Sequence, residues 1–376
     1  MNRDAGISTD HATDVHTDVH TPIASGLLTG LPPGLPHPGP GVAHAALHAW
    51  IDGGAGDGRA VRANEAAWAD IALWPRSLRP LAGSHTRVAL PGGPAPVPWL
   101  VAPMAYQRAA HPDGEAAMAV AAAAQGAGFV LSCQSSTPLQ DVARLFLGDP
   151  GRGPLWFQLH PQPDPATDAA LLARAEAAGV EAIVMTVDAP LQGPRDAERA
   201  AGWRVPPGVA AVNLPPAAAP GLDALLAASA TTDTLRRWRG LTRLPLLVKG
   251  VLHPADAVAA VEAGADGLIV SNHGGRQLAS AVPTARALPA VVAAVGGRVP
   301  VLVDGGLRRG EDVVKALALG ARAVLLGRPL LRALALGGAP AVATQLRGWR
   351  DEFTAAQALC GARTPDELSA LGLLQD

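Results

Sequence analysis

The chain has 376 residues, a formal net charge of −2, 49% hydrophobic and 16% charged residues, and two cysteines. This length accommodates one α/β barrel of about 250 residues with extensions. Scattered arginines without a basic stripe argue against a nucleic-acid partner, and no uncharged apolar run reaches the roughly 20 residues of a membrane span, so we expect no membrane partner either.

Residues 1–40 are predicted to form a disordered tail ahead of a catalytic domain over 41–376. The stretch LPPGLPHPGPG is too rich in Pro and Gly to propagate a helix. His11, His16 and His20 could be read as metal ligands, but no carboxylate or cysteine pattern accompanies them, and a solvated tail is favoured. We therefore predict no metal. The tail lacks the basic start of a secretory signal, and the two cysteines lack disulfide or zinc spacing, so a cytoplasmic location fits.

From residue 98 onward, short β-rich apolar runs alternate with Ala-rich stretches of helical character, which predicts parallel strands joined by crossover helices. The runs are 98–103, 129–133, 155–159, 182–188, 245–250, 267–272, 300–306 and 323–328. Intervening stretches such as TDAALLARAEAAGV end at a Gly placed to stop a helix. Eight such units predict a closed (β/α)8 TIM barrel, and we expect a helical N-terminal extension before it.

Polar residues stand where these runs end, and active sites of such barrels lie at the C-terminal ends of the strands. They are Ser132, Gln158, Thr186, Asp188, Lys249, Ser271, Asn272, His273, Asp304 and Arg328. Stability alone gives little reason to place Lys, His, Asp and Arg at successive strand ends. The sequence therefore predicts an active site at this end of the barrel.

The turns after the last two strands predict a phosphate site. DGGLRRGED and LGRP place Gly residues next to Arg308 and Arg328. Backbone N–H groups at helix starts and guanidinium groups both bind anions. Many sugar-phosphate barrels share such a corner, so it indicates a phosphorylated ligand without naming one.

The stretch SNHGGRQ after the sixth strand places a histidine and an arginine three residues apart. His273 is the candidate base, and Arg276 is the candidate clamp, because a guanidinium binds a carboxylate through two parallel hydrogen bonds. Asp188 could accept a hydrogen bond from His273 and stabilise its protonated form. Lys249 could put positive charge beside a ring that becomes anionic on reduction. In isolation, the same heptapeptide could equally be a surface loop with incidental charges.

Together these residues resemble the FMN-dependent 2-hydroxy-acid oxidases and dehydrogenases, which include glycolate oxidase, lactate oxidase and mandelate dehydrogenase. The resemblance covers roughly residues 42–363 and is carried by TVDAPLQGPR, VSNHGGRQL and VLVDGGLRRGEDVVKALALGA, among others; VAPMAYQRAAHPDGE is most similar to the 4-hydroxymandelate oxidase branch. It implies FMN as cofactor and oxidation of an L-2-hydroxy acid to the 2-oxo acid. His273 would take a proton, flavin N5 would take two electrons, and oxygen or another acceptor would reoxidise the flavin. A homo-oligomer, specifically a tetramer, is also implied.

The resemblance assigns three groups of residues. Around the flavin ring it places the backbone of Pro103, Met104 and Ala105 with Ser132, Gln158, Thr186, Lys249 and Ser271. At the ribityl chain and phosphate it places Asp304, Gly306, Arg308, Gly327 and Arg328. At the substrate carboxylate it places Arg276 and Arg195, with Asp188 as the partner of His273.

Three expected substrate-facing positions depart from the family pattern: Trp50 and His160 replace tyrosines, and Gln134 replaces a tryptophan. A neutral His160 could donate one hydrogen bond as a phenol does, and we expect Arg195 and Arg276 to lower its pKa. These departures leave open an FMN barrel enzyme that oxidises a different substrate, such as an amine or a biosynthetic intermediate. A flavin-binding barrel without catalysis is a third reading, against which the intact base and arginines argue.

The Pro/Ala-rich segment 196–240 is predicted to be a mobile active-site loop, although its composition also fits a plain linker. It shows no amphipathic basic stretch of the kind that binds membranes. Cys133 and Cys360 are expected to be buried small residues and not nucleophiles.

Overall fold

The computed structural model describes residues 44–216, 221–370 and 373–374, to which all structural statements below refer. The predicted tail over 1–40 and its three histidines lie outside these residues. Eight parallel strands close into one barrel, in the spatial order β10-β11-β4-β5-β6-β7-β8-β9. They are β4 (Trp99–Val101), β5 (Gly128–Ser132), β6 (Leu155–Leu159), β7 (Ala182–Thr186), β8 (Leu246–Val251), β9 (Gly267–Val270), β10 (Val301–Val303) and β11 (Ala323–Leu326). The predicted (β/α)8 barrel is confirmed, and each predicted run contributes one strand.

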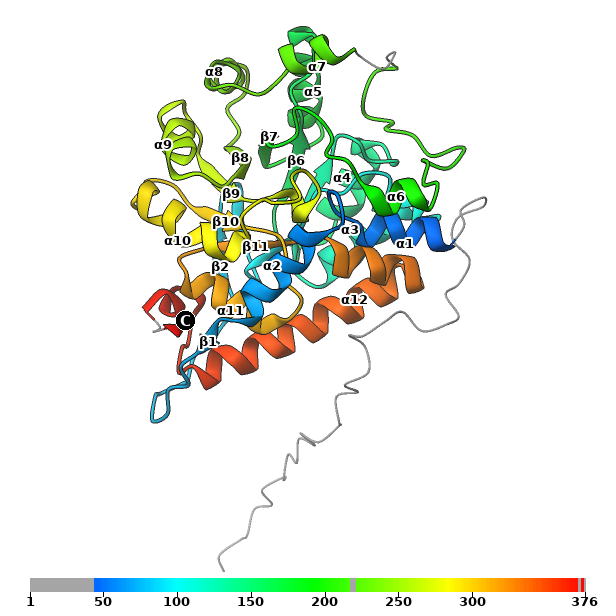
Figure 1. Ribbon diagram of the computed structural model, residues 1–376. Helices are drawn as coiled ribbons and strands as arrows, with labels where there is room; N and C mark the ends of the chain where they lie inside the picture. The colour runs from blue at the N-terminus through cyan, green and yellow to red at the C-terminus, as the bar shows by residue number, and fades with distance from the viewer. Residues whose placement is uncertain (1–43, 217–220, 371–372, 375–376) are drawn as a thin grey trace, which may run out of the picture. The chain divides into compact units, whose positions relative to one another are not determined.

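Helices surround the barrel, as Figure 1 shows. They are α3 (Gly114–Ala124), α4 (Leu139–Leu147), α5 (Pro165–Ala177), α9 (Pro254–Glu262), α10 (Thr284–Val295), α11 (Gly310–Ala318) and α12 (Arg328–Leu359). Sequence signals explain their starts: Pro165 is the first residue of α5, and Asp164 accepts a hydrogen bond from the Ala166 amide at 3.0 Å. The N-terminal extension is helical as predicted, with α1 (His44–Asp52) and α2 (Arg59–Ala69).

One apolar residue from each strand fills the barrel interior. The set is Leu100, Val130, Trp156, Val184, Leu247, Ile269, Leu302 and Leu325, all buried in one cluster. A hairpin of β2 (Val88–Leu90) and β3 (Gly93–Ala95) adds Val88 and Leu90 to this cluster and accepts a hydrogen bond from the Trp156 indole at the Pro91 carbonyl, 3.0 Å away. Arg322, directly before β11, donates to the Ala89 carbonyl of the hairpin at 2.9 Å, so the hairpin covers the N-terminal end of the barrel and leaves the C-terminal end for the site.

The expectation of a loop or linker over 196–240 is wrong in part. The segment holds α6 (Asp196–Ala200), α7 (Leu222–Ala227) and most of α8 (Thr232–Leu241). The Thr231 hydroxyl caps α8 by accepting from the Thr234 amide at 3.1 Å, and Leu235 and Trp238 bury its inner face. Helices α6 and α7 have only five and six residues, and α8 begins shortly after the Pro/Ala-rich stretch, so the composition of the segment did not reveal them. Within the described ranges, no helix has both the length and the apolar character needed to cross a bilayer.

Two short 3-10 helices border the site: η1 (Gln107–Ala109) and η2 (His273–Gly275). A third, η3 (Pro365–Ala370), follows α12, and the last strand β12 (Leu373–Leu374) pairs with β1 (Ala72–Leu73). In Figure 1, α1 lies directly beside α6, and the two helices contact each other. The N-terminal extension and the segment after β7 therefore meet at the C-terminal end of the barrel.

Candidate active site

The polar residues at the strand ends form the next inward-facing layer of the barrel. Side chains alternate along a strand, so the residue two positions after each interior residue points to the same side. Those positions hold Ala102, Ser132, Gln158, Thr186, Lys249, Ser271, Asp304 and Gly327. The strand period alone therefore gathers six polar side chains above an apolar plug.

His273 is held in a strained conformation beside Asp188. Its Nδ1 lies 3.1 Å from Asp188 Oδ1, and its φ of 57° is in the left-handed region that a non-glycine residue adopts only when its surroundings impose it. The imposing contacts include the Ser271 hydroxyl, which accepts from the His273 amide at 3.0 Å. The Asn272 side chain accepts from the Gly275 amide, also at 3.0 Å. The turn therefore fixes the imidazole with one nitrogen on the carboxylate.

Asp188 stays ionised although it is nearly buried. Burial would raise the pKa of its carboxyl, but the adjacent His273 and the nearby Lys249 outweigh burial and lower that pKa. The opposite effects act on Lys249. Burial would lower the pKa of its ammonium group, but the carboxylates of Asp304 and Asp188 outweigh burial and raise that pKa above its usual value. Its ammonium lies 3.2 Å from Asp304 Oδ2 and donates to the Ser271 hydroxyl at 3.0 Å. A fixed positive charge therefore stands between the two carboxylates.

Arg276 is anchored on three sides. Its Nη1 donates to the carbonyl oxygens of Trp50 at 2.8 Å and Gly53 at 3.1 Å, and its Nη2 donates to Glu198 Oε1 at 2.5 Å. A guanidinium has five N–H groups, so two remain for a ligand. Burial and the neighbouring Arg195 lower the pKa of Arg276 to about 10, which keeps it charged at neutral pH.

Arg195 shares the same carboxylate. Its Nη1 lies 3.5 Å from Glu198 Oε2, and its buried Nε has no hydrogen-bond partner among the described residues. A buried guanidinium N–H without a partner is costly unless a ligand accepts from it. The two predicted carboxylate-binding arginines are therefore brought together, with unused donors on both.

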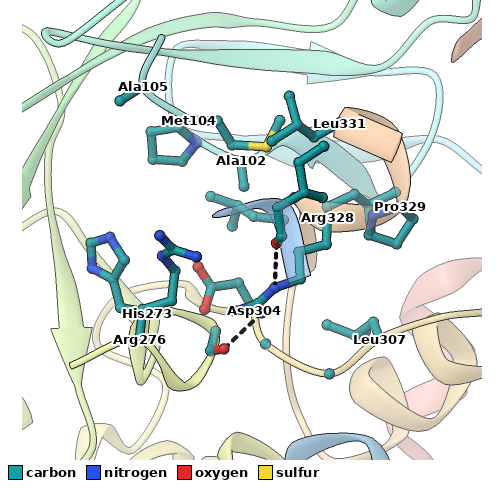
Figure 2. A pocket seen from close by; sticks show the side chains of 18 of the residues that line it. Ala102, Met104, Ala105, His273, Arg276, Asp304, Leu307, Arg328, Pro329 and Leu331 are labelled. Atoms are coloured by element: carbon teal, nitrogen blue, oxygen red, sulfur yellow. Dashed lines mark hydrogen bonds between the residues drawn. The ribbon is translucent and has the colours of Figure 1, made fainter. Parts of the chain in front are cut away.

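The corner after β10 and β11 offers an anion site. Helices α11 and α12 begin there, and Gly305 and Gly306 both have a φ of 88°, which favours glycine. Arg308 donates to the Leu307 carbonyl at 3.0 Å and pairs with Glu65. Figure 2 shows Arg328 reaching across the cavity to main-chain carbonyls. It donates to the Ile51, Gly53 and Gly274 oxygens at 3.1, 2.7 and 2.7 Å.

Most of the predicted site residues line one cavity at this end of the barrel. They are Trp50, Pro103, Met104, Ala105, Gln134, Arg195, Lys249, His273, Arg276, Asp304, Gly306, Arg308, Gly327 and Arg328. Figure 2 shows His273 and Arg276 together on one wall, with Met104 and Leu331 opposite. Ser132, Gln158, Thr186, Ser271, Asp188 and His160 are not among the residues that line it. Ser132, Gln158 and Thr186 form a chain of side-chain hydrogen bonds at 3.0 and 2.9 Å.

For His160 the expected direction of the pKa shift is right and the expected cause is wrong. Its pKa is lowered to about 4, mainly by burial and secondly by the charges of His273 and Lys249. Arg195 and Arg276 are not among the groups that shift it, because its charged neighbours are His273, Asp188 and Lys249. The imidazole is therefore neutral at the pH where most enzymes work.

The expectation for the cysteines is confirmed, since Cys133 and Cys360 are both free and buried. Burial raises the pKa of the Cys133 thiol to about 11, which makes it a poor nucleophile.

Sequence reasoning missed Glu198 and Trp203. The Trp203 ring stacks on Trp50 with centroids 4.8 Å apart and an interplanar angle of 13°. A signal for Glu198 was present, because it follows Arg195 by three residues, a spacing that joins side chains on one helical turn. Trp203 gave no such signal, since its partner is far away in the chain.

The fold and site define a class: a TIM barrel with a partly buried histidine–aspartate pair, two adjacent arginines with free N–H groups, and a corner suited to an anion. Comparison with known proteins identifies the family. Residues 42–374 match the model described as FMN-dependent dehydrogenase. The chain belongs to this family of FMN-dependent 2-hydroxy-acid oxidases and dehydrogenases.

Named relatives cover nearly the whole domain. An L-lactate oxidase of Roseobacter sp. is 46% identical over 88% of this chain and 90% of its own length. The 4-hydroxymandelate oxidase of Amycolatopsis orientalis is 41% identical over 84% and 90%. A solved structure of mandelate oxidase with (S)-2-phenylpropionate has a TM-score of 0.81 at 39% identity, over 89% of this chain and 95% of its own. The protein is accordingly an FMN-dependent oxidoreductase that oxidises a 2-hydroxy acid.

The residues present fit FMN. Asp304 lines the cavity, and its buried Oδ1 has no partner in the described part of the chain, as suits an acceptor for a ribityl hydroxyl. Arg308 and Arg328 supply positive charge where the phosphate is expected. A Cβ at Gly306 would lie 2.6 Å from the Asn64 carbonyl oxygen, so this turn packs closely against α2 only as glycine.

Proposed function

We propose that the chain oxidises an L-2-hydroxy acid to the 2-oxo acid at the C-terminal end of the barrel, with His273 as the proton acceptor. The observation that carries this proposal is the 3.1 Å contact of His273 with Asp188 in the same cavity wall as Arg276. A base held by a carboxylate and an anchored guanidinium within one cavity are what proton removal from a 2-hydroxy acid requires.

Each residue has one task in this scheme. Arg276 and Arg195 hold the substrate carboxylate through their unused N–H groups. His273 Nε2 takes the proton, and Asp188 stabilises the imidazolium that results, with Lys249 countering the charge of Asp188. Bound FMN supplies the acceptor for the two electrons that leave the substrate. Pro103, Met104, Ala105, Ser132, Gln158, Thr186, Lys249 and Ser271 would surround its ring, and Asp304, Gly306, Arg308, Gly327 and Arg328 its ribityl phosphate.

The substrate side chain is proposed to be apolar. Trp50, Met104 and Tyr106 line the cavity, and Gln134 supplies its remaining polar edge. Identities of 46% to a lactate oxidase and 41% to a hydroxymandelate oxidase support both alkyl and aryl side chains. Because these relatives are named oxidases, we propose oxygen as the final acceptor, leaving as hydrogen peroxide.

The test is reduction of the bound flavin without oxygen by a panel of L-lactate, L-2-hydroxyvalerate, L-mandelate and an amine such as L-phenylalanine. We expect bleaching by the hydroxy acids, peroxide formation when air is admitted, and no bleaching by the amine. Reduction by the amine alone would overturn the proposal.

We also propose a cytoplasmic homo-oligomer, a tetramer by resemblance. Trp74 and Leu78 are exposed apolar side chains that contact with another copy would shield from water. The two free cysteines fit a reducing compartment. Light scattering on the eluting holoenzyme measures the number of copies.

A further inference from the structure

The mechanism above gives no task to one nearly buried charged group, which contacts both proposed substrate-binding arginines. Glu198 is only 11% exposed, and both of its oxygens face the arginines proposed to bind the substrate. Oε1 accepts from Arg276 at 2.5 Å, and Oε2 lies 3.5 Å from Arg195 Nη1. A buried carboxylate is expensive, so its presence beside a substrate site calls for an explanation.

We propose that Glu198 determines specificity by restricting this enzyme to 2-hydroxy monocarboxylates and excluding dicarboxylates. The inference rests on the proposed role of Arg195 and Arg276 as the carboxylate clamp. Two guanidinium groups with one resident carboxylate carry a single net positive charge. One substrate carboxylate neutralises that charge, and a second carboxylate meets the repulsion of Glu198 with no cation left for it.

The other charges near the site are already matched. Lys249 lies 3.2 Å from Asp304 and also counters the charge of Asp188, which contacts His273 at 3.1 Å. Arg328 donates to three main-chain carbonyls and, with Arg308, lies at the corner proposed for the cofactor phosphate. No cation lining the cavity in the described part of the chain is therefore left to receive a second substrate carboxylate.

The hydrogen bond from Arg276 to Glu198 also indicates which N–H groups of Arg276 remain for the substrate. Glu198 occupies one N–H of Arg276, while the Trp50 and Gly53 carbonyls occupy two more. The two N–H groups that remain match one carboxylate in a bidentate arrangement. The resident carboxylate thus fixes both the charge and the number of acceptors that the clamp can take.

The first experiment uses the holoenzyme and a pair of substrates that match in length and differ in charge. L-2-hydroxyglutarate and its 5-amide have the same length, but only the first carries a second charge. We expect kcat/KM for the amide to exceed that for the diacid by at least tenfold, equivalent to about 1.4 kcal/mol. Equal values would overturn the inference without any variant.

The second experiment replaces Glu198 by Gln, which keeps an acceptor for Arg276 and removes the charge. The amide-to-diacid ratio should fall by about tenfold. Asp196→Asn is the matched control, because Asp196 is on the same helix and carries the same charge, but it is exposed and paired with Arg199 at 3.6 Å. An equal change in both variants would mean that only net charge matters and would overturn the inference. So would loss of both substrates in Glu198→Gln with FMN retained, since Glu198 would then only anchor Arg276.

A binding measurement separates this inference from the proposed function. The dissociation constants of 2-oxovalerate and 2-oxoglutarate follow from the change in flavin absorbance and need no turnover. If no hydroxy acid reduces the flavin, the proposed function fails, yet a tenfold preference for 2-oxovalerate that disappears in Glu198→Gln would still support the inference. Should that variant not retain FMN, wild-type binding alone decides, and equal constants would contradict it.

Discussion

Replacing His160 by Gln should make the protein less sensitive to acid. In the folded protein the pKa of His160 is lowered to about 4, mainly by burial, whereas an unfolded chain has a histidine pKa near 6.5. Below about pH 6.5 the His160 imidazole is therefore protonated in the unfolded chain, whereas in the folded protein it stays neutral down to about pH 4. The free energy of unfolding therefore decreases as the pH falls below about 6.5, and this decrease ends near the pKa of His160 in the folded protein, about 4. Integrating this linkage from about pH 7 to about pH 5 gives a loss of about 2 kcal/mol from His160 alone.

The measurement is urea unfolding of the FMN-saturated protein, followed by tryptophan fluorescence at several pH values. The stability difference between His160→Gln and wild type should shift in favour of the variant by about 2 kcal/mol on acidification across that range. His44→Gln removes an exposed histidine at the start of α1 and is the control, for which we expect parallel curves. If the His160→Gln and wild-type curves were also parallel, the imidazole would not be held neutral by burial and the reasoning would be refuted.

Three further changes test the site. His273→Ala should retain FMN while substrate-driven flavin reduction falls by roughly 10²–10⁴-fold, the usual worth of a general base; an undiminished rate in stopped-flow absorbance would exclude it as the base. Arg276→Lys should raise KM and lower kcat, because an ammonium cannot keep the three anchoring acceptors and a planar clamp; unchanged steady-state constants would contradict this. Gly250→Ala should lower kcat with FMN retained, since its Cβ would lie 2.5 Å from Asp188 Cβ at a φ of 108°, whereas Gly240→Ala, with nothing within 4 Å, should be silent. Equal effects of the two glycine changes on kcat would disprove the steric argument.

The barrel was predictable because its signal is local. Each strand is a short apolar run between helical stretches, and the period of two then placed Ser132, Lys249 and Asp304 on the inward face above Val130, Leu247 and Leu302. The error was also local: α6 and α7 are only five and six residues long, and the Pro/Ala-rich stretch between α6 and α8 dominates the composition of the segment. The strand-end rule thus located the site even where the connecting segments were misread.

The substrate side was less predictable, because its contacts join distant parts of the chain. His160 was expected beside the arginines, yet its charged neighbours are His273, Asp188 and Lys249. Glu198 and Trp203 were not singled out, since their partners Arg276 and Trp50 come from other segments. A sequence pattern predicts which residue follows a strand. How far that side chain lies from the cavity depends on packing around the whole barrel.

The contacts of Trp50 show that the anchoring of Arg276 and the shape of the cavity wall depend on different parts of the same residue. Trp50 departs from the family's tyrosine, but its contact with Arg276 is through the main-chain carbonyl at 2.8 Å, which every residue type provides. The indole itself stacks on Trp203, so the substituted side chain meets a partner that is also aromatic. Because Arg276 is anchored on the main chain of Trp50 and the cavity wall is its side chain, substitution at position 50 can change the cavity without releasing Arg276, the residue proposed to bind the substrate carboxylate.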